Sequence, residues 1–364
     1  MLFYLTDSLI VDSLDPVYTD VYNTIDNIIK ASEERRHLVM GDYAVLEWFS
    51  RLYDDKNPRK GVLLRMIHNF STDVIPPDLT EYVKVVKGDN EEIEEDGKMV
   101  YLINFQRFKM SISLETSRII GEDENDAKLY AQINRWFLAA KSLPYDVNLR
   151  FEGGGGENTD RKVNSHKELL NIFVCIVDTD QKYRAGAKGK TYNKCNSIVY
   201  NRPLERFYPI EAQEVENIIP KSVLDELPWT NGNRGAKEKY DAILNALKDD
   251  EDGWKYIDLK SGIRKTDKNE ADAQHVAFMK KVYDCLPSQH KSFEEKFNKA
   301  TPCEIMVGLS KDILRNSIGI LENKSNIQLL NISDFLPFQE REWNQIGQIL
   351  LDVGICANGE ATNY

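Results

Sequence analysis

Along the first 230 residues, short apolar runs alternate with segments in which apolar residues recur every three or four positions. Such a pattern is typical of strands alternating with amphipathic helices. In the N-terminal region, residues 1–110, it predicts strands over 3–11, 37–40, 82–86 and 99–105 and helices over 17–32, 61–71 and around 46–49. Six acids within residues 89–96 predict a solvated loop between the last two strands.

The middle region, residues 111–230, continues the alternation. It predicts strands over 117–121, 147–151 and 172–177 and helices over 127–141 and 165–171. The last of these strands is apolar throughout, which suits a strand whose two sheet faces are both covered. We therefore expect an α/β fold with a mostly parallel sheet flanked by helices, in which functional residues gather at the carboxyl ends of the strands.

The C-terminal region, residues 231–364, carries apolar positions at helical spacing and is expected to be mainly helical. The predicted helices cover 237–248, 270–285, 290–298, 302–318 and 337–353. The chain thus divides into an N-terminal α/β region of unknown role (1–110), a middle α/β region (111–230) and this helical region.

Charge and cysteine content narrow the function classes. The chain has 47 Lys and Arg against 59 Asp and Glu, a net charge of −12, which argues against a protein that coats DNA by general electrostatics. No apolar run reaches the roughly 18 residues of a membrane span. The five cysteines are scattered without a Cys-x-x-Cys pair, which argues against a zinc ribbon and predicts a reducing, cytoplasmic location.

Acids follow two of the predicted strands in the middle region. Glu122 comes directly after the strand at 118–121, and Asp178 and Asp180 come directly after the strand at 174–177. In a parallel sheet these strand ends share one edge, so the three carboxylates are expected to converge. Carboxylates are the ligands that Mg²⁺ prefers, and such an ion promotes phosphoryl chemistry and activates water.

The order of these motifs resembles the Toprim domain, the metal-dependent fold shared by topoisomerases, bacterial primases and the overcoming-lysogenization-defect nucleases. The resemblance covers residues 113–230, and 56 residues separate Glu122 from Asp178 (178 − 122). Asp123 stands where the family usually has Gly, which leaves Glu124 open as an alternative to Glu122. A competing alignment takes Glu152 as the motif acid, but it leaves little room before Asp178.

The resemblance implies a Mg²⁺- or Mn²⁺-dependent nuclease that acts on DNA or RNA, as an effector in bacterial antiphage defence beside a separate ATPase partner. It implies that Glu122, Asp178, Asp180 and Glu216 bind metal. Glu214 and Glu216 resemble the Glu-x-Glu-Asn element of stand-alone Toprim nucleases, and either is a candidate second-metal ligand or general base. The glycine run that begins at Gly153 and Gly154 is similar to a loop of defence-type Toprim nucleases, and its amides are candidate phosphate donors.

A basic stretch without acids follows Asp180. Residues 181–200 contain Lys182, Arg184, Lys188, Lys190 and Lys194, interleaved with Tyr183, Tyr192 and Tyr200, and Arg202 and Arg206 come next. We expect the first four cations to contact phosphates and the tyrosines to stack on bases. The Gly189-Lys190-Thr191 triplet resembles the end of a Walker A loop, but the first glycine of that motif is missing.

Other classes of function stay open. One is a non-catalytic Toprim-shaped binding or scaffold subunit, and another is an enzyme related to topoisomerases or primases. A PIN-like nuclease built on Asp7, Asp12, Asp42 and Glu47 is a weaker alternative, because the later acids of that fold have no clear counterparts.

Overall fold

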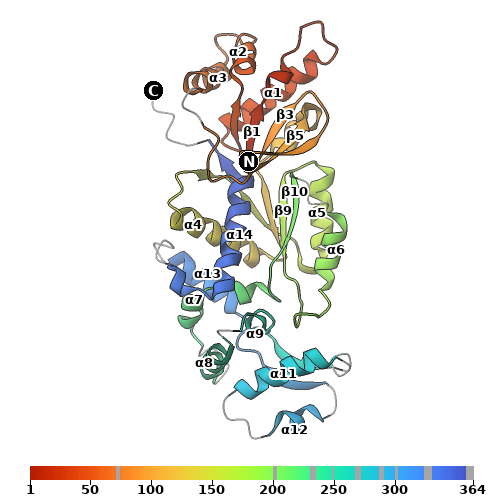
Figure 1. Ribbon diagram of the computed structural model, residues 1–364, viewed down its shortest axis with the longest axis vertical. Coiled ribbons are helices and arrows are strands. Elements are labelled where there is room, and N and C mark those ends of the chain that lie inside the picture. The colour runs from red at the N-terminus through yellow and green to blue at the C-terminus, as the bar shows by residue number, and fades with distance from the viewer. Residues whose placement is uncertain are drawn as a thin grey trace.

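The computed structural model shows an N-terminal, a middle and a C-terminal part along the longest axis of the molecule (Figure 1). Helix α14 runs along the middle part, beside α4. The structure describes residues 1–70, 74–199, 203–229, 235–247, 250–266, 272–286, 291–299, 302–323 and 330–357. None of the helices described combines the length and the apolarity that crossing a membrane requires. None of the five cysteines is in a disulfide.

The N-terminal part is a five-stranded sheet in the order β2-β1-β3-β5-β4 with three helices. Its strands are β1 (Leu2–Leu5), β2 (Leu38–Gly41), β3 (Glu81–Val86), β4 (Glu91–Glu95) and β5 (Lys98–Asn104), and its helices are α1 (Tyr18–Glu33), α2 (Tyr43–Ser50) and α3 (Pro58–Asn69). All neighbouring strands are parallel except β4, which is antiparallel to β5. The strand predicted over 3–11 is shorter, because a 3₁₀ turn begins at Asp7.

Most of the acidic run at 89–96 forms strand β4, so the loop predicted there is wrong. Asp96 and Gly97 both have positive φ, 50° and 73°, and they connect β4 to β5 as a two-residue hairpin. An Asp-Gly turn of this kind matches the twist of paired strands. Because β4 is an edge strand, most of its acids stay exposed to solvent while Ile93 packs on the core.

The middle part contains a four-stranded, fully parallel sheet in the order β10-β9-β6-β8. Its strands are β6 (Arg118–Gly121), β8 (Arg150–Gly153), β9 (Phe173–Val177) and β10 (Glu205–Pro209), and its helices are α4 (Glu124–Ala140), α5 (Thr159–Glu168), α6 (Lys190–Ile198) and α7 (Lys221–Asp225). Helices α5 and α6 cover one face and α4 and α14 the other (Figure 1). The expected α/β class, with a parallel sheet flanked by helices, is therefore confirmed.

The C-terminal region mixes helices with a small antiparallel sheet. It contains α8 (Ala236–Leu247), α9 (Glu251–Lys255), β11 (Gly262–Lys265), α11 (Ala273–Cys285), α12 (Phe293–Phe297), β12 (Cys303–Val307), α13 (Ile313–Asn323) and α14 (Pro337–Gly354). The helix predicted over 302–318 is wrong in its first half, because that half pairs with β11 as strand β12.

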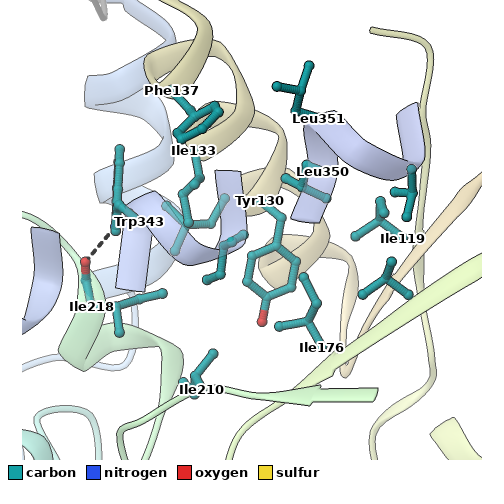
Figure 2. Close-up of a cluster of buried hydrophobic side chains, with 14 of the residues drawn as sticks. Ile119, Tyr130, Ile133, Phe137, Ile176, Ile210, Ile218, Trp343, Leu350 and Leu351 are labelled. Atoms are coloured by element: carbon teal, nitrogen blue, oxygen red, sulfur yellow. Dashed lines mark hydrogen bonds between the residues drawn. The ribbon is translucent and has the colours of Figure 1, made fainter. Parts of the chain in front are cut away.

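Helix α14 leaves the rest of the C-terminal region and packs on α4 across the middle sheet. Figure 2 shows Trp343, Leu350 and Leu351 of α14 facing side chains of α4 and of the sheet. The indole N–H of Trp343 donates to the Ile218 carbonyl at 2.8 Å. Past α14, β13 (Ile355–Cys356) pairs with β7 (Asp146–Val147). Helix α14 therefore helps to fix the sheet that carries the candidate acids.

Candidate active site

Two neighbouring parallel strands bring Glu122 and Asp178 together. Strands β6 and β9 run side by side with Ile120 opposite Cys175, so both chains leave the sheet at the same edge. The backbone N–H of Asp178 donates to Oε1 of Glu122 at 3.1 Å. The hydroxyl of Thr191, in the first turn of α6, also hydrogen-bonds the Glu122 carboxylate. Convergence at the strand ends is thus observed for this pair.

The turn from β6 into α4 explains the unusual Asp123. Its carboxylate accepts hydrogen bonds from the backbone N–H groups of Asn125 and Asp126, and Asp126 accepts from the Asp123 N–H at 2.9 Å. This is a capping box, and it needs a side-chain acceptor that glycine lacks. Glu124 points to solvent with 82% of its side chain exposed and pairs with Lys128. Glu122, and not Glu124, therefore belongs to the acids that gather at this sheet edge. We call these acids, Glu122, Asp178, Asp180, Glu214 and Glu216, the acidic cluster.

Asp180 lies in a loop that the end of β10 holds in place. Its N–H donates to the Gln213 carbonyl at 2.9 Å, and the hydroxyl of Thr179 donates to the carbonyl of Ala212. Asp180 has φ of +52°, in the left-handed region. A Cβ on Gly189 would lie 2.0 Å from Oδ2 of Asp180, so this loop requires glycine at 189.

Glu214 and Glu216 reach the cluster from a 3₁₀ turn at Val215–Ile218. The side-chain amide of Asn217, fully buried, donates to the carbonyls of Trp254 and Ile257 at 2.9 and 2.8 Å. These bonds hold the chain after α9 against the turn. As a result, the Lys260 ammonium lies 3.2 Å from Oε1 of Glu216 and 3.7 Å from Oε2 of Glu214.

The sequence interpretation missed three residues beside the acidic cluster: Asp126, Asp258 and Lys260. Asp126 was visible as the start of α4, but its burial comes from the capping box. Asp258 and Lys260 come from the C-terminal region and belong to no motif. Contacts of Gln213 and Asn217 with the chain at residues 254–257 bring them near the strand ends. No local sequence signal could have found these last two.

Burial and mutual repulsion raise the proton affinity of these acids. Burial, together with the charge of Asp180, raises the pKa of Glu122 to about 7. Burial and the charge of Asp258 raise the pKa of Glu214 to about 8. The pKa of Asp178 is raised well above its usual range by burial first and by Asp126 next. The cluster therefore carries more negative charge than its protein surroundings compensate.

Two further acids are also affected. Burial and the neighbouring Asp123 raise the pKa of Asp126 to about 7. Burial raises the pKa of Asp180, while the ammonium groups of Lys182 and Lys260 act in the opposite direction. For Lys260 burial opposes the charged form, but the two glutamates outweigh it and raise its pKa.

Unpaired oxygens in the cluster fit a hard cation. Oδ1 of Asp178 and Oε2 of Glu216 are buried and accept no hydrogen bond from the described residues. Carboxylate oxygens are the donors that Mg²⁺ and Mn²⁺ take, so the chemistry of the donor set suits such an ion. With the side chains as placed, no three Asp, Glu, His or Cys groups within the described ranges are positioned to hold one ion.

The glycine run has a different role from the one expected. The amide of Gly154 donates to the Gly121 carbonyl at 2.7 Å, and those of Gly155 and Gly156 donate to the Glu122 carbonyl. These amides are used within the fold, so the prediction that Gly154 offers its amide to a phosphate is wrong. A Cβ on Gly153 would lie 2.8 Å from the Glu124 nitrogen. The run therefore lets β8 approach the β6–α4 turn closely.

The basic stretch lies partly beside the cluster. Lys182, Arg184 and Lys188 are exposed in the loop between β9 and α6, and the Lys188 ammonium sits 4.1 Å from the ring centroid of Tyr192. Lys190 begins α6 and donates to Glu157 at 2.6 Å.

The other aromatic and basic residues of this part of the sequence are not all available at the surface. Tyr183 stacks on His275 with ring centroids 5.0 Å apart, so it is already covered by a protein ring. Arg206, which follows the basic stretch, is largely buried against Glu81. Tyr200 and Arg202 lie outside the described residues.

The acids of the two alternative site predictions, the Glu152 alignment and the PIN-like set, form hydrogen bonds or ion pairs within the fold. Burial works against the charge of Glu152, but hydrogen bonds from Lys162 and Arg118 lower its pKa to about 2. Glu152 is thus paired outside the acidic cluster. In the N-terminal sheet, the carboxylate of Asp42 accepts from the Asp7 N–H and the Tyr4 hydroxyl, at 2.9 and 2.8 Å. Asp7 in turn accepts from the backbone at the start of α2.

Comparison with family models, with curated proteins and with solved structures finds no match to this chain. The function is therefore argued from the cluster itself.

Proposed function

We propose that this chain is a metal-dependent nuclease of the Toprim type, which hydrolyses phosphodiester bonds of DNA or RNA. The observation that carries the proposal is the meeting of Glu122 and Asp178 at the ends of adjacent parallel strands, with Glu216 and Lys260 beside them. The buried, unpaired oxygens of Asp178 and Glu216 support it, because a buried carboxylate oxygen without a partner is costly unless a cation compensates it.

The residues divide into three roles. Glu122, Asp178, Asp180 and Glu216 would hold Mg²⁺ or Mn²⁺. When bound, such an ion supplies charge stabilisation at a phosphoryl oxygen and lowers the pKa of a bound water. Glu214, with its pKa raised to about 8, accepts and releases a proton near neutral pH and is the candidate general base.

The third role is phosphate binding. Lys182, Arg184 and Lys188 are exposed on the loop that begins at Asp180, so they present positive charge next to the acids. Lys260 offsets part of the charge of the two glutamates from inside the cluster. An anionic backbone is thereby held at the edge of a site that would otherwise repel it.

The test is cleavage of labelled single- and double-stranded DNA and RNA with Mg²⁺ or Mn²⁺. We expect Asp178→Asn and Glu122→Gln to reduce the rate at least 100-fold while the melting temperature does not fall. Glu92→Gln, on the exposed edge strand β4, is the matched control and should cleave at the wild-type rate. Undiminished cleavage by both site variants would refute the assignment.

The alternative is a binding or scaffold subunit without catalysis. It is favoured by one observation, that no three acidic, His or Cys side chains among the described residues are placed around a single ion. Under that alternative the wild type would bind nucleic acid without cleaving it under any of these conditions.

The Toprim resemblance also implies a biological setting, which we include in the proposal. An effector of bacterial antiphage defence would act with a separate ATPase. Co-expression from the native genomic neighbourhood followed by affinity purification tests this, and recovery of the chain without an ATPase would count against it.

A further inference from the structure

A pocket adjoins the acidic cluster at the loop after β9. It has a volume of about 560 Å³ and lies between the ends of β9 and β10 and helix α14. Thr179 lines it, and the two neighbours of Thr179 in the chain are the acids Asp178 and Asp180. The pocket and the acids therefore adjoin each other through Thr179.

The walls of this pocket combine four kinds of group. Tyr256 and Tyr208 contribute aromatic surface, Gln181 and Gln345 contribute amides, Lys188 and Arg341 contribute positive charge, and Glu211 and Glu342 contribute carboxylates. Oε2 of Glu211 lies 3.9 Å from the Arg341 guanidinium, and burial raises the pKa of Glu342 to about 7. The Tyr208 hydroxyl donates to Oε1 of Gln345 at 2.7 Å, which fixes that amide on the exposed side of α14. The backbone N–H of Glu211 donates to Glu342 at 2.9 Å and ties the β10 end to α14.

The walls therefore match the chemistry of a nucleotide. Aromatic rings stack on a base, amides hydrogen-bond its edge, and cations hold the phosphates on either side. Pockets of about 300–1,000 Å³ suit ligands of this size. Resting on the proposed function, we propose that this pocket receives the unpaired base of a nucleotide next to the scissile phosphate.

The proposal fixes the substrate class. A base in a duplex is stacked and paired, so it enters a side pocket only after it has been displaced from the helix. Single-stranded DNA or RNA needs no such displacement. The chain should therefore prefer single strands, with Tyr256 as the stacking residue and Arg341 as a backbone contact.

Binding without cleavage tests this directly. Fluorescence anisotropy of the full chain is measured in EDTA with fluorescein-labelled 15-nucleotide single-stranded DNA and RNA, with the matching duplexes, and with a strand carrying abasic sites. We expect Tyr256→Ala to weaken single-strand binding about five-fold or more, the lower end of the loss for one stacked base. Tyr256→Phe keeps the ring and should bind as the wild type does.

Three comparisons decide the outcome. The abasic strand should bind the wild type and Tyr256→Ala equally, and duplex affinity should change less than two-fold. Tyr43→Ala, at a half-exposed tyrosine on α2, is the matched control and should have no effect. Arg341→Gln, on an exposed position, should weaken every single strand and covers the case in which Tyr256→Ala does not fold.

The proposal is overturned if Tyr256→Ala binds single strands as tightly as the wild type does, or if its affinity for single strands and for duplexes falls equally. It is also overturned if the wild type binds neither single-stranded DNA nor single-stranded RNA. These readouts need no catalysis. Tyr256-dependent binding without any metal-dependent cleavage would uphold the pocket and refute the nuclease. Cleavage that depends on Asp178 without any Tyr256 effect would do the reverse.

Discussion

At the residue scale, the crowding of buried carboxylates makes the stability of the metal-free chain depend on pH. The pKa of Glu122 rises from an ordinary value near 4.5 to about 7 on folding, and that of Glu214 rises to about 8. The folded state then binds more protons than the unfolded state between these limits, so its stability falls as pH rises. Each pKa unit is worth about 1.4 kcal/mol, so we expect a loss of about 2 kcal/mol or more between pH 5 and 8.

Urea unfolding in EDTA across that pH range measures the loss. Glu122→Gln removes the charge while keeping the shape, so it should flatten the pH profile and raise the stability at pH 8. Mg²⁺ should flatten the wild-type profile as well, because a bound cation compensates the ionised acids. A wild-type profile that is flat or rises with pH in EDTA would contradict the picture of unpaired acids.

The close approach of Asp180 to Gly189 leads to a second residue-scale prediction. A methyl group at 189 meets the Asp180 carboxylate at 2.0 Å, and Asp180 is already in the left-handed region. Gly189→Ala should therefore displace Asp180 and lower cleavage at least ten-fold. Gly61→Ala, in helix α3, has open space around its Cβ and should leave the cleavage rate unchanged. Equal activity of the two variants would show that Asp180 has no part in the reaction.

At the element scale, the sequence predicted what local patterns determine. The alternating apolar runs predicted the parallel sheet, and the acids after β6 and β9 predicted the meeting of Glu122 and Asp178. The hairpin strand β4 was missed because its acids outweighed the Asp96-Gly97 turn signal. The first half of 302–318 was misread because a short apolar run fits a helix or a strand, and pairing with β11 decides which one forms.

The packing of α14 on α4 depends on a glycine and allows a stability prediction. A Cβ on Gly347 would lie 2.3 Å from Cγ of Phe137, a side chain of α4 that is labelled in Figure 2. Gly347→Ala overpacks this contact and should cost about 1–3 kcal/mol in chemical unfolding. Gly319→Ala lies in α13 with open space around its Cβ, so the better helix propensity of alanine should stabilise it by up to about 1 kcal/mol. A gain of stability at both positions would mean that α14 does not pack as described.

At the scale of the whole molecule, the net charge of −12 and the positive charge of the loop after β9 affect nucleic-acid binding differently, because the charges lie in different places. The acids of β4 are exposed on the N-terminal sheet, and Lys182, Arg184 and Lys188 lie beside the acidic cluster in the middle part. Salt screens exposed charges over about 10 Å, so a nucleic acid held at the site responds mainly to the local cations. Weak non-specific affinity and a usable local site are therefore compatible.

The number of phosphate contacts sets the salt dependence of binding. With Lys182, Arg184, Lys188 and Arg341 in contact with phosphates, the slope of log K against log salt concentration for a single strand should be about −3, at roughly 0.7 per neutralised phosphate. Lys188→Gln should reduce the steepness by about 0.7, whereas Lys237→Gln on helix α8, whose ammonium pairs with Asp241, should leave it unchanged. Anisotropy titrations between 50 and 300 mM NaCl in EDTA measure both slopes. A wild-type slope steeper than about −5 would require a much wider basic face than the loop after β9 provides, and it would move the nucleic acid away from the acidic cluster.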